Sequence, residues 1–238
     1  LSHVHFVSNK IAKNRLIQMG EIQKSIFIIG SPEVDIMLSD DLPTISEVKA
    51  RYDISFDNYA IFLYHPVTTE IDILSKNMNI IINALLESGK QYVVVYPNND
   101  FGSNIILESL TSLENNKNFK FYPSLRFEYY ITLMKNAEFI IGNSSAGVRE
   151  ASVFGLPSIN IGTRQQDRAR HKSIINVSEK KDDIVNAIKS LKNQFSPSLD
   201  FGKGNSSKLF IKKILEKNFW RIPNQKQFKD IWGDIVNG

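Results

Sequence analysis

Short β-branched and aromatic runs alternate with helical segments along most of the chain, and this alternation constrains the fold more than any other feature. Central runs such as Tyr92–Tyr96 (YVVVY) are apolar on both faces, as is typical of a strand that helices cover on both sides. Apolar residues at helical spacing fill most of the intervals between the runs. We therefore predict an α/β fold in which helices cover both faces of a parallel sheet. The predicted strands are residues 3–7, 25–29, 59–64, 91–96, 118–122, 138–141, 157–161 and 173–176.

Several helices carry recognisable start and stop residues. Thr44 and Glu47 (TISE) fit a capping box at the start of one helix. Residues 70–88 repeat apolar side chains every three or four positions, and Gly89 ends that pattern. Further helices are predicted from Asn9 to Gly20, as a short segment from Ser31, and at 103–116, 127–136, 145–155, 180–193 and 205–218.

The composition excludes several classes of protein. With 238 residues, 42% of them hydrophobic, the chain is long and apolar enough for one large domain or two small ones. It has no run of about 18 apolar residues, which excludes a membrane span, and no Cys, which excludes disulfides and Cys-ligated zinc. Its 29 Lys and Arg exceed its 25 Asp and Glu by four and are scattered, so no nucleic-acid partner is indicated. We expect a cytoplasmic location, since the lack of Cys permits a reducing compartment.

The start of the chain indicates how it is divided. The chain begins at Leu1 rather than Met, and residues 1–7 already read as a strand without a leader sequence, so we infer a fragment or a chain whose first part is missing. Residues 1–30 form only a strand–helix–strand unit, which is too small to bury its own faces. We therefore expect residues 1–32 to be the remnant of a preceding domain, residues 33–222 to form the main domain, and residues 223–238 to be a tail.

Polar residues collect in the loops that follow the predicted strands. In a parallel sheet, ligands bind outside the carboxyl ends of the strands, and these ends share one edge. The loops together hold one His, several hydroxyls and amides, and Arg side chains. They are residues 65–69, 97–100, 123–126, 142–147 and 162–168.

The segment IIGNSSAGVRE (140–150) is the sharpest candidate for a binding site. A strand ends at Gly142 and a helix begins within about two residues. The open backbone N–H groups at a helix start, with the hydroxyls of Ser144 and Ser145, suit a phosphate. The alternative is that Asn143 or Ser144 simply caps the helix, and this segment alone does not choose between the two. The pattern is neither GxGxxG nor a Walker loop, so those cofactor sites are not indicated.

Charged residues near this segment extend the candidate site. Glu150 could accept two hydrogen bonds from a ribose diol, or it could be an ordinary solvated helix charge. Arg164 and Arg168 follow a strand, where a guanidinium matches the oxygens of a phosphate. The alternative for either Arg is a surface salt bridge.

His65 ends the apolar strand YAIFLYH and precedes Pro66, which restricts it to an extended conformation. An imidazole at this edge could donate to a phosphate or act as an acid or base. The alternative is a satisfied strand-end residue. No HExxH or HxxxH spacing predicts a metal site, and no GxSxG elbow predicts a serine hydrolase.

Four motifs together resemble the hydrolysing UDP-N-acetylglucosamine 2-epimerases. They are HPVTT (65–69), PNND (97–100), GNSSAGVREASVFGLPSINIGTRQ (142–165) and FGKGNSSK (201–208). The match follows most of residues 1–217 in order and spacing. The non-hydrolysing branch usually has a different His loop and a DSGG-type loop in place of GNSS, so the chain sides with the hydrolysing branch.

The resemblance implies a GT-B arrangement of two Rossmann-like domains. Residues 1–32 would close the first domain, the last helix would cross back to it, and UDP would lie mainly on the second domain, residues 33–222. The implied substrate contacts are Ser144 and Ser145 on the diphosphate, Glu150 on the ribose, Arg164 and Asn98 on the nucleotide, the backbone near Leu125 on the uracil, and His65 beside the diphosphate and sugar as the catalytic group.

The implied reaction converts UDP-GlcNAc to N-acetylmannosamine and UDP, for sialic-acid-type surface sugars. Loss of the C2 proton and of UDP gives a 2-acetamidoglucal, to which water adds. The resemblance implies no metal or organic cofactor and a homodimer of the full-length enzyme. Further catalytic groups belong to the first half of domain one, so this chain alone is expected to bind UDP weakly and to turn over poorly or not at all. Ser103 and Asn104 stand where feedback-inhibited relatives carry a basic residue, which argues against regulation by cytidine nucleotides.

Three other functions stay open from the residues. A GT-B glycosyltransferase has a similar second domain and would transfer the sugar of a UDP-sugar to an acceptor other than water. A hydrolysing epimerase of a UDP-diacetamido sugar would share the same motifs. A non-enzymatic binding or assembly module is the third possibility.

Overall fold

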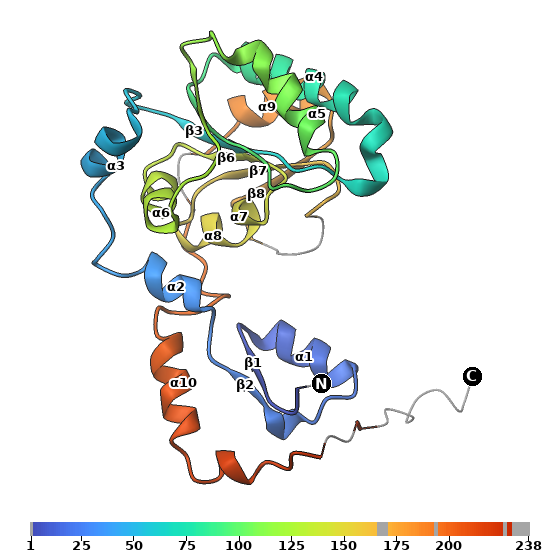
Figure 1. Ribbon diagram of the computed structural model, residues 1–238, viewed down its shortest axis with the longest axis vertical. Helices are drawn as coiled ribbons and strands as arrows, with labels where there is room; N and C mark the ends of the chain where they lie inside the picture. The colour runs from blue at the N-terminus through green and yellow to red at the C-terminus, as the bar shows by residue number, and fades with distance from the viewer. Residues whose placement is uncertain (1, 166–170, 193–194, 226–227, 230–238) are drawn as a thin grey trace. The chain divides into compact units, whose positions relative to one another are not determined.

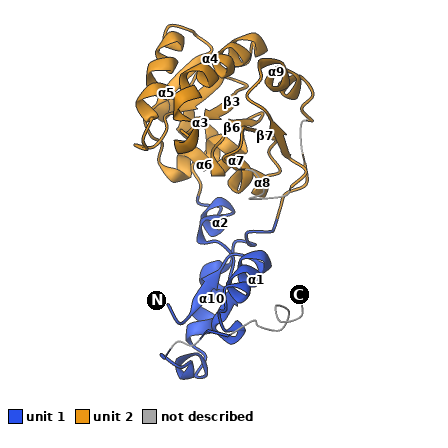
Figure 2. Cartoon of the chain, turned by 90° about the vertical axis from the view of Figure 1, so that its right-hand side faces the viewer, with its two compact units in different colours: residues 1–41, 199–238 blue, residues 42–198 orange. Residues whose placement is uncertain are grey.

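The computed structural model describes residues 2–165, 171–192, 195–225 and 228–229. The chain divides into two compact units, which Figure 2 shows in different colours. Unit 1 comprises residues 1–41 and 199–238, and unit 2 comprises residues 42–198. This division differs from the predicted one, which placed residues 33–41 and 199–222 in the main domain.

Unit 1 is built on a short parallel pair of strands, β1 (His5–Val7) and β2 (Ile26–Ile28). Its α-helices are α1 (Lys10–Gln18), α2 (Pro32–Met37) and α10 (Ser206–Ile214), and its 3-10 turns are η1 (Gln23–Ser25) and η4 (Phe219–Arg221).

Contacts between distant segments explain why α10 belongs to unit 1. The ring of Phe6 on β1 lies 4.8 Å from the ring of Phe210 on α10, measured between centroids. Asp35 of α2 accepts hydrogen bonds from the backbone N–H groups of Ser206 and Ser207, both at 2.8 Å. Contacts between residues so far apart in the chain leave no local pattern in the sequence. For this reason the sequence placed residues 199–222 in the main domain, whereas the structure places them in unit 1.

Unit 2 contains one six-stranded sheet in which every neighbouring pair is parallel. The spatial order of its strands is β5-β4-β3-β6-β7-β8. The eight predicted strands are all present, which confirms the predicted α/β fold with a parallel sheet. The strands of unit 2 are β3 (Ala60–Leu63), β4 (Tyr92–Val95), β5 (Phe119–Tyr122), β6 (Ile140–Gly142), β7 (Ser158–Ile161) and β8 (Ile174–Val177).

Helices cover both faces of this sheet, as Figure 1 shows. Successive residues of β3 point to opposite faces: Phe62 packs in one core and Ile61 in the other. One face carries α4 (Ile71–Ser88), α5 (Ser103–Leu110) and α9 (Lys181–Lys189). The other carries α3 (Ile45–Tyr52), α6 (Phe127–Lys135), α7 (Ser145–Val148) and α8 (Glu150–Val153), and the 3-10 turns η2 (Thr68–Glu70) and η3 (Thr111–Leu113) lie in connections.

Local sequence accounts for most of the helix ends. The Thr44 hydroxyl accepts from the Glu47 N–H at 3.3 Å, and the Glu47 carboxylate accepts from the Thr44 N–H at 2.8 Å, which confirms the capping box. Helix α4 ends at Gly89, also as predicted. The helix predicted at 145–155 is instead broken into α7 and α8 at Arg149, where ψ is −68°. Among the residues that the structure describes, no helix is both long and apolar enough to cross a membrane.

Candidate functional site at the carboxyl edge of the sheet

The strand order reverses between β3 and β6. From β3 the chain proceeds to β4 and β5 in one direction, and from β6 it proceeds to β7 and β8 in the other. Such a switch point leaves a crevice outside the carboxyl ends of the two central strands, where ligands bind in open parallel sheets. Leu63 at the end of β3 pairs with Gly142 at the end of β6, so the loops that follow these two strands begin side by side.

Gly142 makes this close start possible. Its φ is +137°, a conformation that L side chains rarely adopt, and a Cβ built on it would lie 2.0 Å from the carbonyl oxygen of Leu63. The next residue, Asn143, donates its backbone N–H to the same oxygen at 3.2 Å. A glycine at this position therefore brings Asn143 against the chain that leaves β3.

Asn143 connects three of the predicted loops. Its Oδ1 accepts from the backbone N–H of His65 at 2.7 Å, and its Nδ2 donates to the backbone carbonyl of His65 at 2.8 Å. Its own carbonyl accepts from Nη1 of Arg164 at 3.1 Å and from Nε2 of Gln165 at 3.0 Å. The sequence alone suggests only a helix-capping role for Asn143. An amide residue directly after a strand-ending glycine was the available signal.

His65 is 6% exposed, and its pKa lies well below the ordinary value. Burial, and then the positive charge of Arg164, lower the pKa of His65 to about 4, while the negative charge of Asp100 opposes them. The imidazole is therefore neutral at pH 7. Its Nδ1 is buried and has no hydrogen-bond partner within the described part of the chain. The unpaired nitrogen of a neutral ring can donate one hydrogen bond to a ligand or accept one from it, depending on the tautomer.

Ser144 and Ser145 begin the short helix α7. Ser144 is its N-cap, and its hydroxyl accepts from the Ala146 N–H at 3.3 Å, so capping is the role that the structure shows. Both serines are partly exposed. Because α7 is one turn long, any anion here would meet local N–H and O–H donors rather than the summed dipole of a long helix.

Besides the link through Asn143, a direct hydrogen bond joins the loop after β3 to the loop after β7. The Thr163 hydroxyl donates to Glu70 Oε1 at 2.9 Å. This pair lies at the surface, whereas the two hydrogen bonds between the Asn143 side chain and the His65 backbone are buried. The half-buried Arg164 therefore lies in a loop that is held at two points: at Thr163 by Glu70, and at Arg164 and Gln165 by the carbonyl of Asn143.

Glu150 opens α8 and is half-buried. Burial, and then the negative charge of Glu150, raise the pKa of the Tyr130 hydroxyl on α6. The Tyr130 oxygen is buried and makes no hydrogen bond within the residues that the structure places. No feature of the sequence singles out Tyr130, because an aromatic residue early in a helix reads the same whether its hydroxyl faces a site or simply packs in the core.

Asn98 and Leu125 follow β4 and β5, one and two strands away from β3 along the same edge. The carbonyl of Asn98 accepts a hydrogen bond from the Ser103 hydroxyl, while its side chain is exposed. Leu125 packs partly against the core of the α6 face. Within the described residues, no hydrogen bond joins Asn98 or Leu125 to the group formed by His65, Asn143, Arg164 and Gln165. Arg168 lies outside the described residues.

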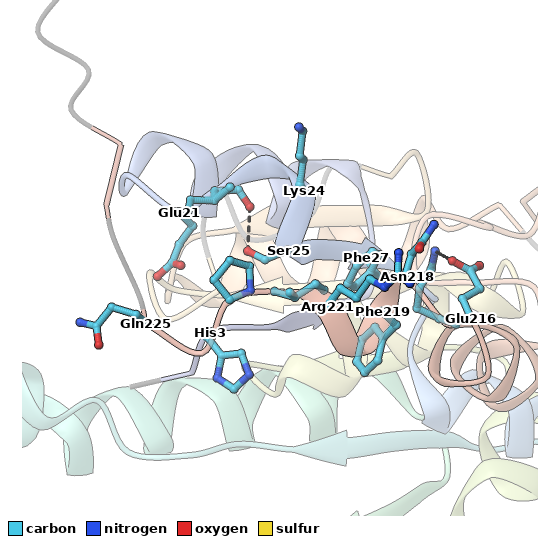
Figure 3. Close-up of a pocket in the computed structure, with 14 residues that line it drawn as sticks. His3, Glu21, Lys24, Ser25, Phe27, Glu216, Asn218, Phe219, Arg221 and Gln225 are labelled. Carbon is cyan, nitrogen blue, oxygen red and sulfur yellow. Dashed lines mark hydrogen bonds and ion pairs between the residues drawn. The ribbon is translucent and has the colours of Figure 1, made fainter.

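A separate hollow of about 650 Å³ lies within unit 1. Figure 3 shows Phe27, Phe219, Lys24 and Glu216 among the side chains around it. None of the predicted site residues lines this hollow, and the described residues contain no group of three or more His, Asp or Glu side chains that could hold a metal ion. The predicted site residues that the structure describes belong instead to unit 2.

A doubly wound parallel sheet with polar loops at its switch point defines a Rossmann-like α/β protein. The family described as UDP-N-acetylglucosamine 2-epimerase matches residues 1–215, and the chain belongs to this family. The UDP-N-acetylglucosamine 2-epimerase of Neisseria meningitidis serogroup B is 42% identical to it over 97% of the chain. The UDP-N,N'-diacetylbacillosamine 2-epimerase (hydrolyzing) of Legionella pneumophila is 31% identical over 87% of the chain.

Solved structures show the same fold. The Methanocaldococcus jannaschii UDP-GlcNAc 2-epimerase, crystallised with UDP-GlcNAc and UDP, matches 90% of this chain with a TM-score of 0.71 at 22% identity. The fold is thus that of part of a GT-B-type epimerase. The chain spans 62% of the length of the N. meningitidis relative, 56% of the L. pneumophila relative and 61% of the M. jannaschii chain.

Proposed function

We propose that the protein containing this chain is a hydrolysing UDP-N-acetylglucosamine 2-epimerase, which converts UDP-GlcNAc and water to N-acetylmannosamine and UDP. Membership of the epimerase family and the 42% identity to the N. meningitidis enzyme support the substrate. Relatives from L. pneumophila and Campylobacter jejuni, 31% and 33% identical, are hydrolysing epimerases of diacetylbacillosamine nucleotides, which supports the hydrolytic reaction. A 31% identical Escherichia coli protein of polysialic acid biosynthesis supports a role in sialic-acid-type sugars.

The observation that carries the proposal is the cluster at the switch point, where one buried residue, Asn143, bonds both His65 and Arg164 directly before Ser144 and Ser145. In this proposal the diphosphate of UDP lies against the hydroxyls and N–H groups of the two serines. The guanidinium of Arg164 supplies the positive charge that the phosphate oxygens require.

The remaining assigned residues would hold the nucleoside. Glu150 would accept hydrogen bonds from the two ribose hydroxyls, and Asn98 would contact the nucleotide from the loop after β4. The backbone near Leu125 would contact the edge of the uracil. Their common position on the carboxyl edge of one sheet supports these roles.

His65 would act at the bond that breaks. Because its imidazole is neutral at pH 7, it carries one N–H that can donate to the β-phosphate as UDP leaves C1. The C2 proton leaves in the same step and a 2-acetamidoglucal forms, and water then adds to that double bond. No residue of this chain is assigned as the base that removes the C2 proton. We therefore propose that the chain alone binds UDP with little or no turnover.

The wider properties of the protein are part of the same proposal. We propose a homodimer of the full-length enzyme in the cytoplasm, working without a metal or an organic cofactor. The absence of Cys is compatible with a reducing compartment.

The decisive experiment incubates the full-length protein with UDP-GlcNAc and no acceptor except water. Formation of free N-acetylmannosamine together with an equal amount of UDP is the expected result. UDP release that requires an added sugar acceptor would instead identify a glycosyltransferase. UDP binding without any turnover of the full-length protein would identify a binding module.

A second candidate is an epimerase of a UDP-diacetamido sugar. The diacetylbacillosamine epimerases among the relatives favour it. A competition assay with equal concentrations of UDP-GlcNAc and UDP-N,N'-diacetylbacillosamine separates the two, because the true substrate has the larger kcat/KM.

A further inference from the structure

We propose that Asn143 is a positioning residue, which holds the imidazole of His65 and the guanidinium of Arg164 in one fixed relation at the switch point. This inference rests on the proposed function, because that function assigns His65 and Arg164 to the nucleotide. Asn143 itself is not assigned a contact with substrate.

The side chain of Asn143 fixes the direction in which His65 leaves β3. It accepts from the N–H of His65 and donates to the carbonyl of the same residue, at 2.7 and 2.8 Å. Only a carboxamide offers an acceptor and a donor in this fork. A carboxylate would place an acceptor against the His65 carbonyl, and an aliphatic side chain would leave both backbone groups without partners in a site where Asn143 is 1% exposed.

The backbone of Asn143 fixes the other half of the pair. Its carbonyl accepts from Arg164 and from Gln165, so both lone pairs of one oxygen are used by consecutive residues of the loop after β7. Gln165 is 2% exposed, which keeps its hydrogen bond away from competing water. One residue thus joins the loop after β3 to the loop after β7, across the point where the strand order reverses.

A purely structural Asn143 would make the same contacts, so the test needs a readout that loss of stability alone does not move. His65 provides it. Burial and the charge of Arg164 lower its pKa, and Asp100 is the group that opposes them. When the fork is lost, His65 gains access to water and moves relative to Arg164, and its pKa returns toward the ordinary value of 6.5.

The experiment follows the imidazole signals of the whole chain by NMR while the pH is lowered from about 8 to about 5, in the range where an ordinary His titrates. The chain has four His residues, and the spectrum of His65→Gln identifies the signal of His65. In the wild-type chain the His65 signal stays that of a neutral ring over this range. In Asn143→Leu, which keeps the shape of the side chain, the midpoint rises into the range, by about one pH unit or more.

Asn143→Ser is used if Asn143→Leu does not fold, because its hydroxyl can still satisfy one of the two backbone groups of His65. Tyr59→Phe is the matched control. It removes one buried hydrogen bond, from the Tyr59 hydroxyl to the Leu133 carbonyl at 2.7 Å, at the opposite end of β3. The control is expected to lose stability and to leave the His65 signal unchanged.

The proposal is overturned if the His65 titration keeps its wild-type position in whichever Asn143 variant folds, or if wild-type His65 already titrates near 6.5. UDP binding, measured by calorimetry on the same chains, is expected to weaken at least about threefold in the variant, the loss typical of one hydrogen bond. A wild-type chain that fails to bind UDP contradicts the proposed function, while the titration still decides the role of Asn143.

Discussion

His65 and Arg164 both hydrogen-bond the buried Asn143, and the positive charge of Arg164 is, after burial, the second cause of the low pKa of His65. Two cations at this spot would repel each other, and the imidazole avoids this by staying neutral. The two residues therefore have different roles. In the proposed site, Arg164 supplies the permanent positive charge for the phosphates and His65 supplies a single N–H.

The low pKa of His65 predicts a loss of stability in acid. An unfolded His titrates near 6.5 and folded His65 near 4, so between these values the unfolded chain binds more protons. Stability therefore falls as the pH falls through this window. Between about pH 7 and about pH 4.5 the loss from this one group is about 2 kcal/mol. Urea unfolding of the chain at the two pH values measures it.

His65→Gln is the control for that measurement, because glutamine does not titrate. The difference in unfolding free energy between the two pH values is expected to be smaller in His65→Gln than in the wild type, by about 2 kcal/mol. Equal differences in the two chains would show that His65 is not held in its neutral form by the fold.

Gly142 predicts a sharp contrast with another glycine of the same unit. Alanine at 142 would place its Cβ 2.0 Å from the Leu63 carbonyl oxygen at a φ of +137°, so we expect Gly142→Ala to lose at least about 3 kcal/mol or to remain unfolded. Gly89 also has a positive φ, +64°, but nothing lies within 4 Å of a Cβ there. Gly89→Ala is expected to lose about 1 kcal/mol, from backbone strain alone. Denaturant unfolding compares them, and equal losses would contradict the close approach of β3 and β6.

The sequence predicts the layers of unit 2 well because they rest on local patterns. Every residue of strand Tyr92–Val95 is aromatic or β-branched. The sequence of the long helix Ile71–Ser88 shows both an apolar stripe and the Gly89 that ends the helix. The rule that parallel strands share a carboxyl edge then brings the polar loops together without coordinates. The parts that were missed depend on distant contacts. Phe6 and Phe210, whose contact helps to place α10 in unit 1, are far apart in the chain.

The candidate site divides in the same way. Residue types at the strand ends predict His65, Ser144 and Arg164 as a group, since each type suits a phosphate. The fork between Asn143 and His65 joins residues 78 positions apart, and the burial that lowers the pKa of His65 is a property of the packed sheet. Neither is visible in a single sequence. The break at Arg149, which shortens the helix after Ser144 to one turn, is likewise absent from the apolar spacing.

The two serines predict an effect on nucleotide binding that can be separated from stability. Replacing both, Ser144→Ala with Ser145→Ala, is expected to weaken UDP binding to this chain by about 1–2 kcal/mol, the scale of lost hydrogen bonds to a charged group. The same variant loses the N-cap of α7 and about 1 kcal/mol of stability. Calorimetric titration with UDP at a temperature where both chains are folded measures the first effect.

Ser112→Ala is the control for the serine variant, because Ser112 is an exposed serine whose hydroxyl makes one local hydrogen bond, donating to the backbone carbonyl of Ser109 at 2.8 Å. It is expected to bind UDP like the wild type. An unchanged affinity in the double variant would remove the phosphates from Ser144 and Ser145 and leave those residues with the capping role alone.

In the full-length protein, His65 is expected to act on the chemical step itself. If the N–H of His65 donates to the departing β-phosphate, the interaction strengthens as negative charge develops there, so it lowers the barrier more than it tightens substrate binding. His65→Ala is then expected to lower kcat by about 10²-fold or more, the scale of general acid catalysis, with a much smaller change in KM. Steady-state release of N-acetylmannosamine measures both constants. A rise in KM at constant kcat would make His65 a binding group only, because uniform binding leaves the chemical barrier unchanged.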